Sequence, residues 1–175
     1  MTKIGFIGLG KLGLPACYTY AYLGHKIMGY DINPKRMTYD LDTIEAGLSG
    51  KGSIEELFKD NENIKNNLSF STNLEEVINF GDIIFVAIQT PHDKKFEGIE
   101  RLTKDRKDFD YTYLINSIKD ISIVLDKLNT KKIVSIISTV LPGTIRKYIF
   151  PHLSKNIKLC YNPYFIAMGT VARDL

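Results

Sequence analysis

The sequence has only two cysteines among its 175 residues, Cys17 and Cys160. Both lie in apolar segments, so we expect buried, reduced thiols in a cytoplasmic protein rather than a disulfide scaffold or a metal site. The chain also lacks any run of about 18 uninterrupted apolar residues, the length that a membrane-spanning helix needs. Its first residues do not have the pattern of a secretion signal. The sequence therefore predicts neither a membrane span nor export.

A strong excess of one charge sign is missing as well. The 23 basic and 20 acidic residues leave a net charge of +3, and the basic residues are spread along the chain. Nucleic-acid-binding domains usually concentrate positive charge on one face, so nucleic acid is not an expected partner. The hydrophobic share of 44% and the charged share of 25% are typical of a folded globular domain. The length predicts one domain over residues 1–175.

Short apolar runs with strand character alternate with segments of helical periodicity. The runs are Ile4–Ile7, Ile27–Tyr30, Leu68–Ser71, Ile83–Ile88, Ile133–Ile137 and Ile157–Tyr161. Strands that alternate with helices are typical of a parallel sheet covered on both sides. We predict the α/β fold class, with a doubly wound, mostly parallel sheet and helices on both faces.

The clearest predicted helix follows Asp110, which is placed as its N-cap. Its apolar residues recur at steps of three and four and form one stripe: Leu114, Ile118, Ile121, Leu125 and Leu128. Capping-box spacing predicts two shorter helix starts, at Ser53 with Glu56 and at Asn73 with Glu76. Between residues 89 and 109 lies a long loop with charges of both signs. It is either a functional lid or a solvated loop, and the mixed charge favours the solvated loop.

A glycine-rich turn carries the strongest chemical signal. It reads Gly8-Leu9-Gly10-Lys11-Leu12-Gly13 and joins the first apolar run to a helical segment that has Pro15 in its first turn. In such a G-x-G-x-x-G sequence the first glycine permits a tight turn, the second lets the backbone approach a pyrophosphate, and the third permits close packing. The free amides and the dipole of the helix start attract phosphate. We predict that residues 8–13 bind a dinucleotide, as in Rossmann domains, rather than forming a purely structural turn.

Asp31 stands at the end of the next apolar run, 31 − 13 = 18 residues after the last glycine. A carboxylate at about that spacing accepts hydrogen bonds from the adenosine ribose and repels a 2′-phosphate, which favours NAD over NADP. The alternative is that Asp31 caps the helix that follows it. Arg36, five positions later, could contact the ribose or adenine, or even accommodate a 2′-phosphate. The alternative is a solvated charge on the following helix.

Three later stretches resemble the motifs of one enzyme family. Each follows a predicted strand: Ile88-Gln89-Thr90-Pro91, Ser138-Thr139-Val140-Leu141-Pro142-Gly143-Thr144 and Asn162-Pro163-Tyr164-Phe165-Ile166-Ala167-Met168-Gly169. In order and spacing they resemble the TP, STVxPGT and NPEFLxEG motifs of the UDP-glucose/GDP-mannose 6-dehydrogenases. Glu45-Ala46-Gly47-Leu48 resembles the family's EPGL turn, and Asp174 matches an acid beyond the third motif.

The resemblance implies further site residues. Gln89, Thr90, Pro91 and Ser138 would line the cofactor, together with Thr139, which would lie near the nicotinamide and position a water or the reacting carbon of the sugar. A threonine or a Thr-Pro pair at a strand end also occurs as a plain cap or turn, so this structural alternative remains.

Enzymes of this family oxidise the C6 alcohol of a nucleotide sugar to a carboxylate with two NAD molecules and a cysteine nucleophile. In the family that cysteine belongs to a C-terminal domain beyond a helical domain, and neither is present here. Tyr164 and Met168 replace the two glutamates of the third motif. With a pKa near 10, tyrosine is a poor base at neutral pH, so a catalytic role for Tyr164 is the weaker half of the prediction.

The resemblance therefore implies an NAD-binding domain that acts on a nucleotide sugar and is incomplete as an enzyme alone. It would form a homodimer or associate with the absent domains. Two alternatives stay open. The first 31 residues also resemble β-hydroxyacid dehydrogenases, and the chain could be a non-catalytic module that binds NAD or a nucleotide sugar.

Overall fold

The computed structural model describes residues 1–39, 61–96, 105–166 and 171–175. Within these ranges one sheet contains six strands: β1 (Lys3–Ile7), β2 (Lys26–Tyr30), β3 (Leu68–Phe70), β4 (Ile83–Val86), β5 (Lys132–Ile136) and β6 (Ile157–Tyr161). All neighbouring strands are parallel, in the order β3-β2-β1-β4-β5-β6. The chain reverses its direction of winding between β1 and β4, as in a doubly wound fold. The fold class predicted from the sequence is confirmed.

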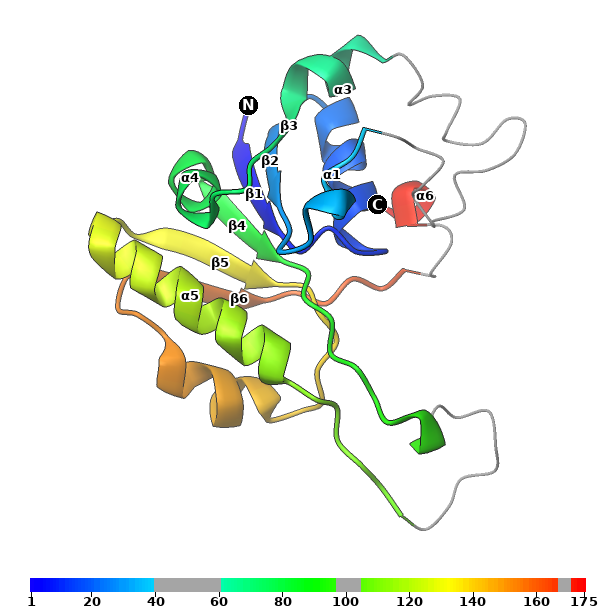
Figure 1. The fold of residues 1–175 in the computed structure, drawn as a ribbon, viewed down its shortest axis with the longest axis vertical. Helices are drawn as coiled ribbons and strands as arrows, with labels where there is room; N and C mark the ends of the chain where they lie inside the picture. The colour runs from blue at the N-terminus through cyan, green and yellow to red at the C-terminus, as the bar shows by residue number, and fades with distance from the viewer. Residues whose placement is uncertain (40–60, 97–104, 167–170) are drawn as a thin grey trace.

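Helices cover both faces of this sheet (Figure 1). The α-helices are α1 (Gly13–Tyr22), α3 (Glu62–Asn67), α4 (Leu74–Phe80), α5 (Thr112–Leu128) and α6 (Val171–Asp174). Short helical turns are η1 (Pro34–Arg36), η3 (Lys94–Phe96), η4 (Ile145–Ile149) and η5 (Phe150–His152). Figure 1 shows α1, α3 and α6 on one side of the sheet and α4 and α5 on the other. Among the residues placed by the structure, no helix is long and apolar enough to cross a membrane.

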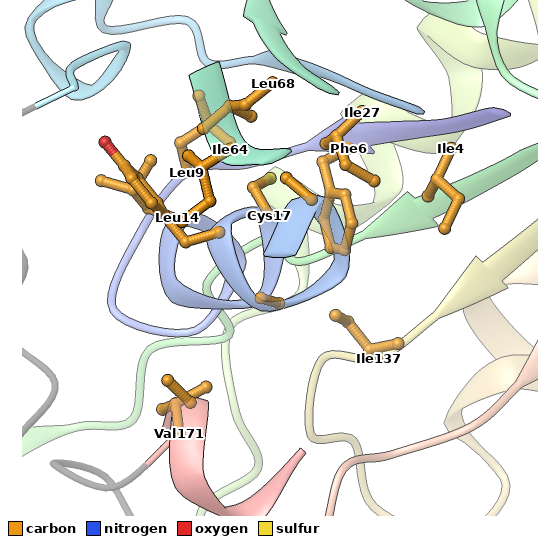
Figure 2. Packing of buried hydrophobic residues seen from close by; sticks show 14 residues of the cluster. Ile4, Phe6, Leu9, Leu14, Cys17, Ile27, Ile64, Leu68, Ile137 and Val171 are labelled. Carbon is orange, nitrogen blue, oxygen red and sulfur yellow. The ribbon is translucent and has the colours of Figure 1, made fainter. Parts of the chain in front are cut away.

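The two faces of the sheet bury two separate cores. Successive side chains of a strand point to opposite faces, so Phe6 packs towards α1 while the adjacent Ile7 packs towards α5. Figure 2 shows the α1-side cluster, in which Cys17 of α1 and Val171 of α6 lie with residues of the first strands. Burial of these apolar side chains fixes α1 against β1 and thereby positions the loop between them.

Helix α5 confirms the predicted apolar stripe, since Leu114, Ile118, Ile121 and Leu125 are completely buried. Asp110 lies one residue earlier than a formal N-cap, which is Tyr111. Its carboxylate nevertheless accepts a hydrogen bond from the Thr112 amide at 2.9 Å. The pKa of Asp110 is lowered chiefly by a hydrogen bond with the Thr112 side chain and also by this amide bond. The carboxylate thus satisfies one of the free amides at the helix start.

Two further sequence predictions are wrong. Cys160 is exposed, not buried. It lies in β6, the outermost strand, and points to the face opposite Leu159, which packs in the α5-side core. The capping box at α4 is only half formed: Asn73 accepts from the Glu75 amide at 3.0 Å, but Glu76 accepts from the Ser71 hydroxyl. The predicted box at residues 53–56, the turn at 45–48 and residues 167–169 lie outside the described residues.

Candidate cofactor site

The carboxyl ends of the central strands meet at one edge of the sheet, which we call the rim. The Gly8 amide donates to the Tyr30 carbonyl at 2.8 Å, and the Ala87 amide donates to the Ile7 carbonyl at 2.8 Å. These bonds place the loops after β1, β2 and β4 side by side. Ligands of open α/β sheets bind at such an edge, where the strand order reverses.

The glycine turn needs its glycines for different reasons. Gly8 has a φ of +95°, a backbone conformation that favours glycine. A Cβ at position 13 would lie 1.9 Å from the Gly8 carbonyl oxygen, so Gly13 lets the start of α1 approach the turn. Of the residues in the described ranges, a Cβ at position 10 would meet only the Arg36 guanidinium, at 3.0 Å. The space above Gly10 is therefore bordered by one flexible cation and by no backbone of the described residues.

The start of α1 suits an anion. Its N-cap is Leu12, no side chain caps it, and its first turn has no acidic residue. Pro15 lies in that turn, as predicted, where its lack of an N–H removes no helical hydrogen bond. The Leu14 amide in this turn donates to the Gly10 carbonyl at 3.1 Å. The amides that precede it have no acceptor in the helix, and they lie at the positive end of the helix dipole. Because neither a cap nor an acid competes for them, the start of α1 can hold phosphate.

Asp31 links the glycine turn to the end of β2. Its Oδ2 accepts from the Leu9 amide at 2.7 Å, and its Oδ1 accepts from the Asn33 amide at 2.8 Å. The N-cap of the following turn η1 is Asn33, whose side chain accepts from the Lys35 amide, so Asp31 is not that cap. Each carboxylate oxygen can accept more than one hydrogen bond, which leaves capacity for ribose hydroxyls.

The sequence motifs after β4 and β5 also meet at the rim. The Thr90 hydroxyl donates to the Thr139 carbonyl at 2.8 Å, while the Thr139 side chain is exposed. Gln89 and Pro91 are exposed beside them. Ser138 differs: it is buried, and its hydroxyl donates to the Val86 carbonyl at 3.4 Å. The Ser138 side chain is thus bonded to the neighbouring strand, and only the backbone of Ser138 can face a ligand.

The side chain of Tyr164 packs against residues of α1 and β4. Its hydroxyl forms a hydrogen bond of 2.9 Å with the hydroxyl of Tyr20 in α1, and its ring packs edge-on against Phe85. Burial raises the pKa of Tyr164 well above its usual value, and the bond to Tyr20 adds to this effect. A tyrosine in this setting stays protonated at neutral pH and is unsuited to act as a base.

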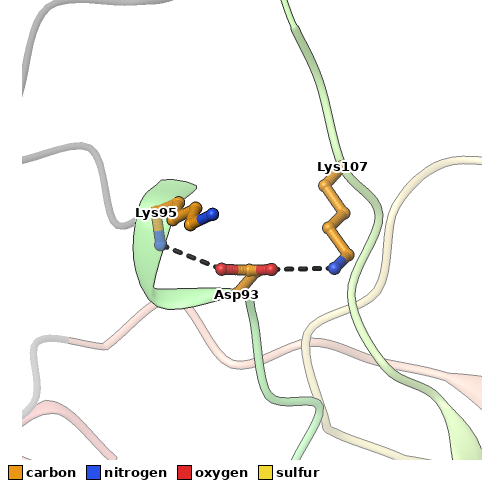
Figure 3. Close-up of polar contacts among 3 residues, drawn as sticks. All are labelled: Asp93, Lys95 and Lys107. Carbon is orange, nitrogen blue, oxygen red and sulfur yellow. Dashed lines mark hydrogen bonds and ion pairs between the residues drawn. The ribbon is translucent and has the colours of Figure 1, made fainter.

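An exposed ion pair joins the two ends of the charged loop between β4 and α5. Asp93 accepts from the Lys107 ammonium at 2.7 Å and from the Lys95 amide at 3.0 Å (Figure 3). These contacts, chiefly the Lys107 hydrogen bond, lower the pKa of Asp93. Residues 97–104 lie outside the described ranges, so the choice between a lid and a solvated loop remains a prediction.

Sequence reasoning missed two tyrosines that contact the loop after β5. The hydroxyls of Tyr111 and Tyr161 accept hydrogen bonds from the amides of Leu141 and Val140, respectively. The partners are 30 and 21 residues apart, so no local pattern indicates these contacts.

Comparisons with known proteins agree with this geometry. The UDP-N-acetyl-D-mannosamine dehydrogenase of Methanococcus maripaludis (strain C7) is 28% identical over 179 residues, which cover 99% of this chain and 36% of that protein. A GDP-mannose dehydrogenase structure from Pseudomonas aeruginosa has a TM-score of 0.75 at 21% identity, and it matches 99% of this chain and 38% of its own. A UDP-glucose dehydrogenase structure from Pyrobaculum islandicum has a TM-score of 0.72 at 24% identity, with the same two coverages of 99% and 38%. Both structures share the fold, and the chain spans well under half the length of these relatives.

The family model for the NAD binding domain of the UDP-glucose/GDP-mannose dehydrogenases matches residues 2–175. The match includes the Asn162-Pro163 segment, which the β-hydroxyacid dehydrogenase alternative leaves unexplained. The chain therefore belongs to the UDP-glucose/GDP-mannose dehydrogenase family, as its NAD binding domain.

Proposed function

We propose that this chain is the NAD-binding part of an enzyme that oxidises the C6 alcohol of a nucleotide sugar. The observation that carries the proposal is the pairing of an uncapped helix start beside Gly10 with the carboxylate of Asp31 at the same rim. The first can hold a pyrophosphate and the second a ribose, so the residues present fit NAD. Bound NAD supplies the acceptor for a hydride from the sugar alcohol.

Each part of the rim has a distinct task in this proposal. The backbone of residues 8–13 holds the pyrophosphate, and Lys11 and Arg36 add positive charge near it. Asp31 accepts from the ribose hydroxyls and disfavours a 2′-phosphate. Thr90, Pro91 and Gln89, with the backbone of Ser138, border the nicotinamide half. Thr139 offers an exposed hydroxyl to the reacting end.

The second oxidation needs a thiolate, and Cys17 does not provide one. Cys17 is completely buried in α1, and burial raises its pKa well above the usual value. Because Tyr164 is also a poor base, we propose that the full reaction needs further residues, from a longer chain or a partner. Homodimer formation and a cytoplasmic location remain predictions.

Calorimetric titration with NAD and with NADP tests the proposed cofactor site. We expect the parent chain to bind NAD more tightly, and Asp31→Ala to weaken NAD binding and remove the preference. Asp82→Ala is a matched control, because the Asp82 carboxylate also accepts from a backbone amide, that of Lys3 at 3.0 Å, but does so at the amino end of β1. Equal binding of NAD and NADP by the parent chain would contradict the role of Asp31.

The Tyr20–Tyr164 pair specifically favours one other function, a binding module without catalysis. NADH absorbance, followed with UDP-glucose and GDP-mannose, separates the two functions once NAD binding is established. Turnover by a chain supplemented with the remaining domains supports the enzyme. NAD binding without turnover in that supplemented assay supports the module.

A further inference from the structure

The turn that carries Thr139 is held through its backbone by three side chains from different parts of the chain. Thr90, after β4, donates to the Thr139 carbonyl at 2.8 Å. The next two backbone amides, of Val140 and Leu141, donate to the hydroxyls of Tyr161 and Tyr111 at 3.3 and 3.2 Å. Backbone groups in a loop must find partners outside regular structure, and here side chains supply them. Three consecutive residues are therefore fixed while the Thr139 side chain itself stays exposed.

Tyr111 is well placed to hold this turn rigidly. It is only 5% exposed, and its hydroxyl donates to the Asp108 carboxylate at 2.6 Å while it accepts from Leu141. Its ring packs against Phe109 and Tyr148. A hydroxyl with a charged acceptor on one side is a fixed and strengthened hydrogen-bond partner on the other.

Tyr161 contacts the turn from the end of β6. Its hydroxyl lies within hydrogen-bond distance of both the Val140 amide, at 3.3 Å, and the Val140 carbonyl, at 3.4 Å. Tyr161 is 38% exposed, so its ring contributes less to the core than that of Tyr111. The contact to the turn is the specific feature that its hydroxyl provides.

Beyond Val140 and Leu141 the turn closes on itself. The Thr144 amide donates to the Leu141 carbonyl at 3.1 Å, with Gly143 at a φ of +88°. Pro142 and Gly143 thus occupy the central positions of a tight turn with the glycine in the left-handed region. Because this Leu141–Thr144 turn is fixed by its own hydrogen bond, the orientation of Thr139 depends on how the amides of residues 140 and 141 are held.

We propose that Tyr111 and Tyr161 are positioning residues for Thr139. They hold the two amides that follow it and so direct its hydroxyl towards the nicotinamide half of NAD. The inference rests on the proposed function, in which NAD lies along this rim. Neither tyrosine is expected to touch the cofactor.

Variants of the 175-residue chain that remove only a hydroxyl test this role. Tyr111→Phe and Tyr161→Phe keep the rings, and Tyr113→Phe is the matched control, because Tyr113 lies in the same segment and is 52% exposed. Binding of NAD and of ADP-ribose, which lacks the nicotinamide, is measured by calorimetry for each folded variant. Amide hydrogen exchange of Val140 and Leu141 by NMR reports the turn directly.

We expect Tyr111→Phe and Tyr161→Phe each to weaken NAD binding by about fivefold, the size of one lost hydrogen bond, and to leave ADP-ribose binding unchanged. Exchange should accelerate at Leu141 in the first variant and at Val140 in the second. In a Thr139→Val background neither change should weaken NAD binding further, because both act through that hydroxyl. Tyr113→Phe should resemble the parent in every measurement.

The results that overturn the role are distinct from those that overturn the proposed function. The positioning role would be refuted if both variants kept the parent's ratio of NAD affinity to ADP-ribose affinity, whether the two affinities fell equally or did not change. Cofactor binding would stand in either case. Tyr161→Phe decides the matter if Tyr111→Phe does not fold. A parent chain that binds neither ligand would refute the proposed function, and the positioning role with it.

Discussion

Replacing Gly13 with alanine should destabilise the whole domain. The new Cβ would lie 1.9 Å from the Gly8 carbonyl oxygen and 3.2 Å from the Cβ of Ala87. A carbon–oxygen contact needs roughly 3.3 Å, so the start of α1 and the turn must separate by more than about 1 Å. The atom it meets is backbone, and no side chain can swing aside. Overpacking of this kind costs about 3 kcal/mol, and the better helix propensity of alanine returns at most about 1 kcal/mol.

The expected net loss is thus about 2 kcal/mol, or roughly 4–8 °C in melting temperature for a domain of this size. Thermal unfolding followed by circular dichroism measures it. Gly24→Ala is the control, because Gly24 has a φ of +88° but no atom of the described part of the chain within 4 Å of its added Cβ. That variant carries only backbone strain of about 1 kcal/mol. If the melting temperature of Gly13→Ala equals or exceeds that of Gly24→Ala, the close approach of α1 to the turn is not what requires Gly13.

Three further outcomes follow from burial and charge. Leu114→Ala, at a completely buried position of α5, should lose about 2–5 kcal/mol of unfolding free energy in urea titrations. In the native chain a thiol reagent should modify the exposed Cys160 and leave the buried Cys17 unmodified until the protein unfolds; two fast thiols would contradict the packing. The folded state lowers the pKa of Asp93, so its contribution to stability is present above the unfolded pKa and disappears as pH falls through the folded one. Lys107→Met should raise the Asp93 pKa in an NMR titration, and an unchanged value would show that the ion pair is absent in solution.

The sheet could be predicted from the sequence because its central strands are largely buried on both faces, so that they form apolar runs in the sequence. All six strands occur where predicted, with ends that differ by at most two residues, as at Val86, where β4 stops before Ile88. The glycine turn and Asp31 were also predictable, since steric need and spacing define them locally.

Contacts between distant residues could not be predicted in this way. The apolar run around Cys160 indicates a strand, but its place at the sheet edge, which exposes the thiol, is a property of topology. Glu76 had two available partners, and the nearby Ser71 hydroxyl bonds to it in place of the Asn73 amide. The bond of Tyr164 to Tyr20 joins residues 144 positions apart, and only the fold brings them together.

The affinity of Gly10→Ala for NAD tests the central claim most directly. Among the residues that the structure describes, its added Cβ would meet only the movable Arg36 guanidinium, at 3.0 Å, so the variant should fold and melt like the parent. The same methyl group would occupy the space in which the pyrophosphate approaches the backbone, and we expect NAD binding to weaken by about tenfold or more in calorimetry. A folded Gly10→Ala variant that binds NAD as tightly as the parent would contradict the placement of the cofactor at this turn.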